Sequence, residues 1–373
     1  MRPEIVVDLA AIRRNVATLK RLVSPAALMT VVKADGYGHG ILESARAARQ
    51  GGADWIGVAT VTEALALRDA GDQGPLLCWL TLPADVEDGS IARAVDQGID
   101  VTAYTVERLD EIAALPGTPR VQLKVDTGLS RGGAALADWP ALATAAAALE
   151  AAGRVKVTGV WSHFACSDEP DHPANDEQQA RFDQALTTAE DAGLRPEVRH
   201  LANSAAAILR PSSRLDLVRV GLASYGLDPA PDVPHGVDLR PAMTVRAPLA
   251  LSKQIAKGES VSYGQTWTAP EDTTVGLVPA GYGDGVPRHG SNVLEVAIDG
   301  VRRPVRGRVC MDQVVVDLRG DLPEPGTEVV LFGPGDHGEP TAQEWAVACG
   351  TISYEIVTRI GGRLERRYEG DET

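Results

Sequence analysis

Thr30-Val31-Val32-Lys33-Ala34-Asp35-Gly36-Tyr37-Gly38-His39-Gly40 is the most informative segment of this sequence. The apolar, β-prone run 27–32 predicts a buried strand that delivers Lys33 into a glycine-rich turn, and a helix follows from about Ile41. Burial lowers the pKa of a lysine, and its neutral amine is a nucleophile toward a carbonyl or an aldehyde. The pattern therefore favours Schiff-base chemistry at Lys33. The alternative is a solvated loop lysine beside glycines that only form a tight turn.

Strands and helices alternate from this segment to Val220. The predicted strands cover residues 27–32, 54–59, 75–80, 99–103, 120–125, 156–162, 197–201 and 215–220. Parallel strands joined by right-handed helical crossovers form either a barrel or an open sheet, and eight such units suit a (β/α)8 TIM barrel. A doubly wound open sheet is the alternative.

The pattern changes after about Asp228. Pro229, Pro231 and Pro234 crowd together, and strands then follow one another without convincing helices. Turn pairs such as Asp299-Gly300 separate these strands, as in a β-rich domain. We expect a barrel over residues 8–232, and a mostly β second domain made of residues 1–7 and 233–373.

Composition excludes several classes of partner. The net charge of −15 disfavours nucleic acid and anionic membranes, since both repel an acidic surface. The 373 residues contain neither a membrane-length apolar run nor a targeting segment, and the four cysteines lack metal or redox spacing. We expect a soluble, unprocessed cytoplasmic protein without a metal.

Polar residues gather where the predicted barrel strands end, and chemistry in a TIM barrel takes place at those carboxyl ends. The residues concerned are Lys33, Asp126, Arg131, His163, Asn203, Ser204, Arg219 and Gly221. Asn203-Ser204 opens a short predicted helix, where free amides favour a phosphate, and Gly221 permits close approach of the backbone. A plain N-cap is the alternative for Asn203-Ser204.

The sequence resembles the alanine racemases, the pyridoxal 5'-phosphate enzymes of fold type III, over nearly its whole length. The most specific match is the segment 32–40, which resembles the cofactor-lysine motif of the family. Supporting matches lie at residues 124–133, 161–165, 200–206, 219–222, 261–264, 281–285 and 307–312. The resemblance implies interconversion of L-alanine and D-alanine by a two-base mechanism, which supplies D-alanine for peptidoglycan.

The resemblance also implies roles for single residues. Lys33 would hold the cofactor and act as the base on one face of the substrate, and Tyr263 would be the base on the other face. Arg219 would face the pyridine nitrogen, where most enzymes using this cofactor place a carboxylate. The remaining cofactor contacts would come from Tyr37, His163, Asn203, Ser204, Gly221, Leu222 and Tyr354, with His200 behind Arg219.

Substrate binding and assembly follow from the same resemblance. Arg131 and the Met311 amide would bind the alanine carboxylate, and Tyr282 would narrow the entrance. Lys124 matches a lysine that is carbamylated in several members, with an unmodified lysine as the alternative, and Cys310 and Asp312 flank Met311 in its motif. The family implies a head-to-tail homodimer in which Tyr263, Tyr282 and Met311 reach the active site of the other subunit.

Three other functions stay open at this point. A racemase of broader specificity, acting on alanine and serine, would keep Lys33 and Tyr263. A fold-type III decarboxylase would usually carry an acidic residue in place of Arg219. A non-catalytic cofactor carrier would lack the second domain and Tyr263.

Overall fold

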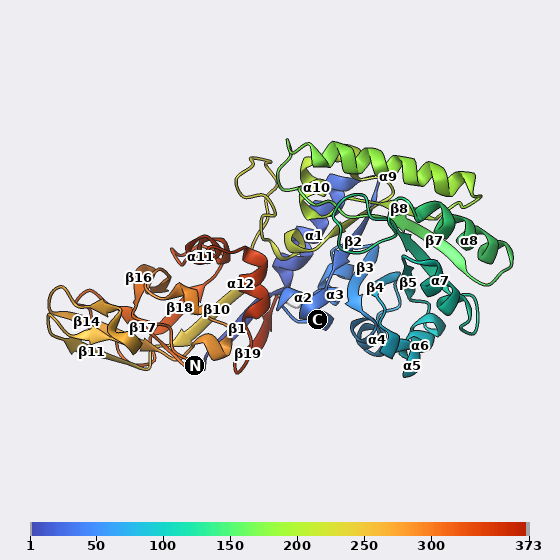
Figure 1. Ribbon diagram of the computed structural model, residues 1–373. Helices are drawn as coiled ribbons and strands as arrows, with labels where there is room; N and C mark the ends of the chain where they lie inside the picture. Colours follow the sequence, from blue (N-terminus) through green and yellow to red (C-terminus); the bar gives the residue numbers. More distant parts are fainter. Residues whose placement is uncertain (1, 371–373) are drawn as a thin grey trace.

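A computed structural model of the protein describes residues 2–370. Met1 and residues 371–373, which the predicted second domain includes, lie outside the described residues. The chain forms a barrel of strands wrapped by helices and, beside it, an elongated β-rich domain (Figure 1). No helix among residues 2–370 is long and apolar enough to cross a membrane.

The barrel contains eight parallel strands in the order β8-β7-β6-β5-β4-β3-β2-β9. They are β2 (Ala27–Val31), β3 (Trp55–Thr60), β4 (Leu76–Leu80), β5 (Asp100–Ala103), β6 (Arg120–Lys124), β7 (Lys156–Trp161), β8 (Val198–His200) and β9 (Leu217–Val220). Backbone hydrogen bonds from Asp216 N to Arg199 O and from Arg219 N to Ala202 O join the last two segments. The predicted TIM barrel is confirmed, and the open sheet is excluded.

Helices surround the barrel. They are α1 (Leu9–Val23), α3 (Ile41–Gln50), α4 (Val61–Asp69), α5 (Pro83–Glu87), α6 (Ser90–Asp96), α7 (Val106–Ala113), α8 (Trp139–Ala151), α9 (Ala174–Asp191) and α10 (Ser204–Leu209). Each of them except α5 buries some of its side chains. The segment between β4 and β5 forms two short helices instead of one. Gly89, with φ of 77°, separates α5 from α6, because a left-handed residue cannot continue a right-handed helix.

The second domain is built on a nine-stranded sheet in the order β11-β14-β17-β16-β15-β18-β10-β1-β19. Its strands are β1 (Glu4–Asp8), β10 (Met243–Pro248), β11 (Leu251–Ile255), β14 (Thr273–Val278), β15 (Glu295–Ile298), β16 (Val301–Arg306), β17 (Val314–Asp317), β18 (Glu328–Phe332) and β19 (Glu365–Glu369), and β12 (Ser260–Val261) pairs separately with β13 (Trp267–Thr268). The first strand of the chain, β1, lies between β10 and β19. The predicted Asp299-Gly300 turn joins β15 to β16, and both residues have positive φ, as such hairpins require.

Two helices of this domain were missed by the sequence analysis. They are α11 (Ala342–Cys349) and α12 (Ser353–Arg359), so the expectation of strands without helices was wrong here. Thr341 and Glu344 form a reciprocal capping box at the start of α11, and their spacing was a signal that could have revealed it.

Directly after β2, the backbone makes one left-handed turn, α2 (Lys33–Tyr37). Ala34, Asp35 and Tyr37 have φ of 53°, 54° and 54°, a conformation that costs a non-glycine residue about 1–2 kcal/mol. Side chains compensate: Glu63 accepts a hydrogen bond from Ala34 N at 2.7 Å, and Asp35 accepts one from Ile41 N at 2.9 Å. The left-handed conformation is therefore stabilised by hydrogen bonds with residues outside the turn.

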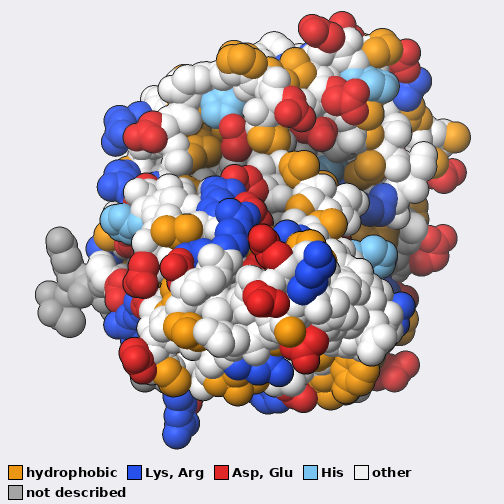
Figure 2. Space-filling model, turned by 90° about the vertical axis from the view of Figure 1, so that its left-hand side faces the viewer, with side chains coloured by type: hydrophobic (Ala, Val, Ile, Leu, Met, Phe, Trp, Pro, Cys, Tyr) orange, Lys and Arg blue, Asp and Glu red, His pale blue; other side chains and the backbone are white. Residues whose placement is uncertain are grey.

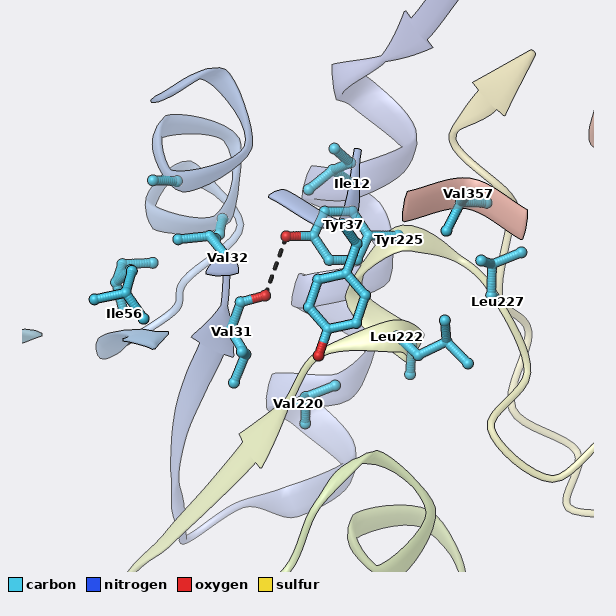
Figure 3. Packing of buried hydrophobic residues seen from close by; sticks show 14 of the residues in the cluster. Ile12, Val31, Val32, Tyr37, Ile56, Val220, Leu222, Tyr225, Leu227 and Val357 are labelled. Carbon is cyan, nitrogen blue, oxygen red and sulfur yellow. Dashed lines mark hydrogen bonds between the residues drawn. The ribbon is translucent and has the colours of Figure 1, made fainter. Parts of the chain in front are cut away.

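The second domain packs directly on this turn. Arg366 of β19 forms an ion pair with Asp35 at 2.8 Å. Figure 3 shows the Tyr37 and Tyr225 rings packed near Val357 of α12, with the Tyr225 hydroxyl donating to Val31 O at 3.1 Å. The position of Lys33 and Tyr37 thus depends on both domains.

Replacing Gly38 tests this contact. Gly38 has φ of +80°, and an added Cβ would lie 2.3 Å from Val357 O. Gly38→Ala should lower the free energy of unfolding by about 2 kcal/mol or more, from backbone strain plus the collision. Gly71→Ala is the matched control, because Gly71 has φ of +94° with nothing within 4 Å, and should cost only about 1 kcal/mol. Thermal unfolding by circular dichroism measures both, and equal losses would contradict the packing argument.

Candidate active site

A cavity of about 790 Å³ opens at the carboxyl ends of the barrel strands. β2 pairs with β9 so that Thr30 lies opposite Val220, and the segments that follow both strands therefore enter the same rim. The predicted site residues that line this cavity are Lys33, Tyr37, Lys124, Arg131, His163, Asn203, Ser204, Arg219, Gly221, Leu222 and Tyr354. The structure thus brings these barrel residues together with Tyr354 of the second domain.

Lys33 lies in the part of the cavity bordered by Trp79. Its Nζ is 5.7 Å from the Trp79 ring centroid. Desolvation lowers the pKa of Lys33, the Arg131 cation lowers it further, and Glu63 acts in the opposite direction. Lys33 therefore carries a larger neutral fraction than a solvated lysine at the same pH.

Arg219 is buried and surrounded by acceptors. Its Nη2 donates to Ser162 O at 2.7 Å and Leu201 O at 3.1 Å, and also contacts His163 Nδ1 at 3.0 Å. Its Nη1 contacts His200 Nδ1 at 2.9 Å. Burial and the Arg131 cation lower the pKa of Arg219, yet an arginine keeps its proton near neutral pH. Both Nη atoms are engaged, which leaves Nε–H for a ligand in the cavity.

The two histidines beside Arg219 are neutral. Burial and the neighbouring Arg219 cation lower the pKa of both His163 and His200 well below the usual value. Because arginine only donates, Nδ1 of each ring must be the unprotonated nitrogen. His200 also stacks on Trp161 with ring centroids 5.6 Å apart.

Another part of the cavity presents hydroxyl groups around Gly221. Ser204 Oγ accepts from Gly221 N at 3.0 Å, and the Tyr37 and Tyr354 rings lie 6.1 Å apart. A Cβ on Gly221 would lie 2.3 Å from the Tyr37 hydroxyl, so only glycine leaves room there. Asn203 caps α10 through Ala206 N at 3.1 Å, which fits the N-cap alternative for this residue.

Lys124 and Arg131 form the cationic side of the site. Lys124 Nζ lies 4.4 Å from the Trp161 ring centroid. Desolvation and the cations Arg219 and Arg131 lower the pKa of Lys124 to about 8. The Arg131 backbone donates to Asp126 at 3.1 Å, a hydrogen bond within the loop that follows β6.

Three predicted site residues of the second domain, unlike Tyr354, lie outside this cavity. Tyr263, Tyr282 and Met311 are exposed, with 70%, 39% and 55% of their surface accessible, and none lines the barrel cavity. Two backbone hydrogen bonds join the loop of Tyr282 to the loop of Met311. They run from Tyr282 N to Cys310 O at 3.0 Å and from Gly283 N to Met311 O at 2.8 Å. Ser262, next to Tyr263, contacts Cys310 Sγ at 3.3 Å.

We call Tyr263, Tyr282 and Met311 the second-domain cluster. Asp312, beside it, pairs with Arg363 at 2.6 Å. Figure 2, seen from the side of the second domain, shows acidic, basic and apolar side chains interspersed over the surface that faces the viewer. Within one chain the predicted site is therefore divided into a barrel part and a second-domain part.

Some residues of the site were not assigned a role from the sequence. Trp79 and Trp161 line the cavity, and Gln122 contacts His200 beneath it. The signal for Gln122 was a polar residue inside an apolar strand, two positions before Lys124. Among residues 2–370, no three His, Cys, Asp or Glu side chains gather as metal ligands.

Comparisons with known proteins agree with this geometry. Residues 7–229 match the family model "Alanine racemase, N-terminal domain", and residues 242–368 match "Alanine racemase, C-terminal domain". The alanine racemase of Streptomyces coelicolor is 52% identical over 379 residues, covering 99% of this chain and 96% of the relative. That of Thermobifida fusca is 52% identical over 366 residues, covering 98% and 97%.

Solved structures give the same result. The alanine racemase of Streptomyces lavendulae has a TM-score of 0.96 at 49% identity and covers 100% of this chain and 98% of its own. The Bacillus anthracis alanine racemase with bound L-Ala-P has a TM-score of 0.90 at 33% identity, covering 100% and 96%. This chain therefore belongs to the alanine racemase family.

Proposed function

We propose that this protein is a pyridoxal 5'-phosphate-dependent alanine racemase that interconverts L-alanine and D-alanine and supplies D-alanine for peptidoglycan. The observation that carries the proposal is the presence, in one cavity, of a partly desolvated Lys33 and a buried Arg219 fixed by neutral histidines. An arginine at this position distinguishes a racemase from the decarboxylase alternative.

The cavity fits the cofactor. The missing Cβ at Gly221 and the surrounding hydroxyls of Tyr37 and Ser204 form a cradle suited to a phosphate group. Lys33 would hold the cofactor covalently, and the phosphate would be bound by Tyr37, Ser204, Gly221, Leu222 and Tyr354. When bound, the pyridine ring of pyridoxal phosphate withdraws electrons from the substrate and makes its Cα proton acidic.

Arg219 would govern the reaction type. Its free Nε–H would donate to the ring nitrogen, and because a guanidinium keeps its proton, that nitrogen would stay unprotonated. His163 and His200 hold the guanidinium by accepting from its Nη atoms. Arg219 thereby limits the electron withdrawal that other enzymes obtain with a carboxylate.

Racemisation requires a proton to leave one face of Cα and return to the other, so two bases are needed. The Lys33 amine would serve one face, and the Tyr263 phenol of the partner subunit would serve the other. The exposed second-domain cluster supports this sharing, because Tyr263, Tyr282 and Met311 are exposed and do not line the cavity of their own chain. We therefore propose a head-to-tail homodimer with shared active sites.

Arg131 would bind the substrate carboxylate, assisted by the Met311 amide of the partner subunit. Lys124 would become carbamylated: its neutral amine attacks carbon dioxide, forms an N–C bond and releases one proton. The resulting anion would lie among Lys33, Arg131 and Arg219, whose positive charges act on Lys124 in the free protein. Carbamylation would thus orient Arg131 by replacing repulsion with attraction.

The first test concerns Lys33. Lys33→Ala should abolish the visible absorbance of lysine-bound cofactor and lower racemisation by at least about 1,000-fold, since one residue serves both binding and proton transfer. After borohydride reduction and digestion of the wild type, the peptide containing Lys33 should carry the pyridoxyl group. Lys253→Ala, an exposed lysine on β11, is the control and should behave as the wild type. Normal turnover by Lys33→Ala would exclude the assignment.

The second test concerns the shared site. Lys33→Ala and Tyr263→Phe proteins, each nearly inactive, are unfolded together and refolded at equal amounts, so that about half of the dimers are mixed. Each mixed dimer has one site with both residues intact, so activity should recover to about a quarter of the wild type. A mixture no more active than its parents, with mixed dimers demonstrated by differential tags, would rule out sharing.

The third test concerns Lys124. Carbon-13 NMR with labelled bicarbonate should show a carbamate signal that Lys124→Arg lacks. Because the reacting form is the neutral amine and the pKa of Lys124 is lowered to about 8, carbamylation of the unmodified protein should increase as pH rises through that value. An identical spectrum for the wild type and Lys124→Arg would leave Lys124 as an unmodified lysine.

A further inference from the structure

We propose that Asp100 and Gln122 are positioning residues for Arg219, acting through the tautomer of His200. The inference deepens the proposed function and rests on it for its effect on catalysis. Neither residue lines the cavity, and both lie beneath it inside the barrel.

The tautomer of His200 is determined by its two neighbours. Arg219 Nη1 lies 2.9 Å from His200 Nδ1, and arginine can only donate, so Nδ1 accepts. A neutral imidazole then carries its proton on Nε2. His200 Nε2 lies 2.7 Å from Gln122 Oε1, which accepts that proton.

The orientation of Gln122 is determined in turn by Asp100. Gln122 Nε2 donates to Asp100 Oδ2 at 2.9 Å, and an ionised carboxylate can only accept. A flipped Gln122 amide would place its oxygen against the carboxylate and its NH2 group against the Nε2–H of His200. Asp100 therefore selects the one orientation that supports this tautomer.

Asp100 is itself held firmly. Its carboxylate accepts from Thr158 Oγ1 at 2.5 Å and from Arg120 Nε at 2.6 Å. Asp100, Gln122 and His200 are 1%, 0% and 0% exposed, so water cannot substitute for a lost partner. The chain of bonds runs from Asp100 at the start of β5 to His200 at the end of β8.

A glycine on the neighbouring strand leaves space for the Gln122 amide inside the barrel. Gly159 of β7 lies opposite Gln122 in the register, and a Cβ there would lie 2.8 Å from Gln122 Cδ and Oε1. A glycine at this position permits the amide to reach His200. The close approach of Gly159 to Gln122 is an observation separate from the hydrogen bonds. It indicates that packing also fixes the position of the Gln122 amide.

The consequence concerns Arg219. If His200 carried its proton on Nδ1, that N–H would face the Nη1–H of Arg219, and the guanidinium would have to move. The Nε–H of Arg219 would then no longer point into the cavity in the direction that suits a ligand. Asp100 and Gln122 thus act on the reaction only through the position of Arg219.

The experiment is NMR of histidine ring nitrogens in protein labelled with 15N-histidine, with and without pyridoxal phosphate. The His200 signals are identified by their absence in His200→Gln. In the wild type, we expect Nε2 protonated and Nδ1 unprotonated throughout the neutral pH range. A protonated Nδ1 would overturn the proposal, whatever the activity of the protein.

Asp100→Asn tests the anchor. It should give His200 signals of mixed tautomers, shift the visible absorbance of the bound cofactor, and lower kcat about tenfold with little change in KM. Glu197→Gln is the matched control, because Glu197 pairs with the same Arg120 at 3.1 Å but does not contact Gln122. It should leave all three quantities unchanged.

If the Asp100→Asn protein does not fold, the Gln122→Met protein tests the proposal instead. Its side chain is of similar length and has no acceptor for Nε2–H, so the His200 Nε2 signal should shift and kcat should fall about tenfold. A folded Asp100→Asn or Gln122→Met protein with the wild-type His200 spectrum and kcat would overturn the proposal. A wild type with the expected tautomer but no racemisation would instead refute the proposed function.

Discussion

The site depends on one chemical constraint: a guanidinium can donate hydrogen bonds but cannot accept them. Burying Arg219 therefore requires acceptors wherever its Nη atoms point, and the barrel supplies the carbonyls of Ser162 and Leu201. The two remaining acceptors are histidine nitrogens, which accept only if the rings stay neutral. The buried Arg219 thus determines which nitrogen of His163 and of His200 carries the proton. It also explains why polar residues lie beneath the cavity, inside the barrel.

A second feature, the left-handed turn after β2, places Lys33 and Tyr37 on the same short segment. The turn is unfavourable by itself, because Ala34, Asp35 and Tyr37 all adopt positive φ. It persists because Glu63 of α4, Ile41 of α3 and Arg366 of β19 bind its polar groups. The geometry of the lysine is therefore a property of the whole molecule.

The sequence predicted the barrel well, because eight apolar runs separated by amphipathic helices leave few alternatives. It also located Lys33, His163 and Arg219 on one rim, since the carboxyl ends of parallel strands meet at one edge. It did not reveal the left-handed turn, because nothing local distinguishes Ala34 and Asp35 from residues of an ordinary turn. Those positive φ angles are imposed by contacts from distant segments.

The role of Gln122 lay beyond sequence reasoning for a related reason. Its partners, Asp100 and His200, lie on other strands, and periodicity gives the face of a residue but not the register between strands. The helices α11 and α12 were missed for a different reason, because for α11 a local signal was present in the sequence. The capping pair Thr341 and Glu344 was visible, but the surrounding strand pattern outweighed it.

The placement of β1 between β10 and β19 has a mechanical consequence. The barrel is inserted into the second domain, so the backbone crosses between them twice, once from β1 to α1 and once after β9 toward β10. A domain attached by one linker can swivel in any direction, whereas two attachments leave covalent freedom only for rotation about the line that joins them. The Arg366–Asp35 ion pair at 2.8 Å opposes that rotation, because it holds β19 of the second domain against the turn that contains Lys33.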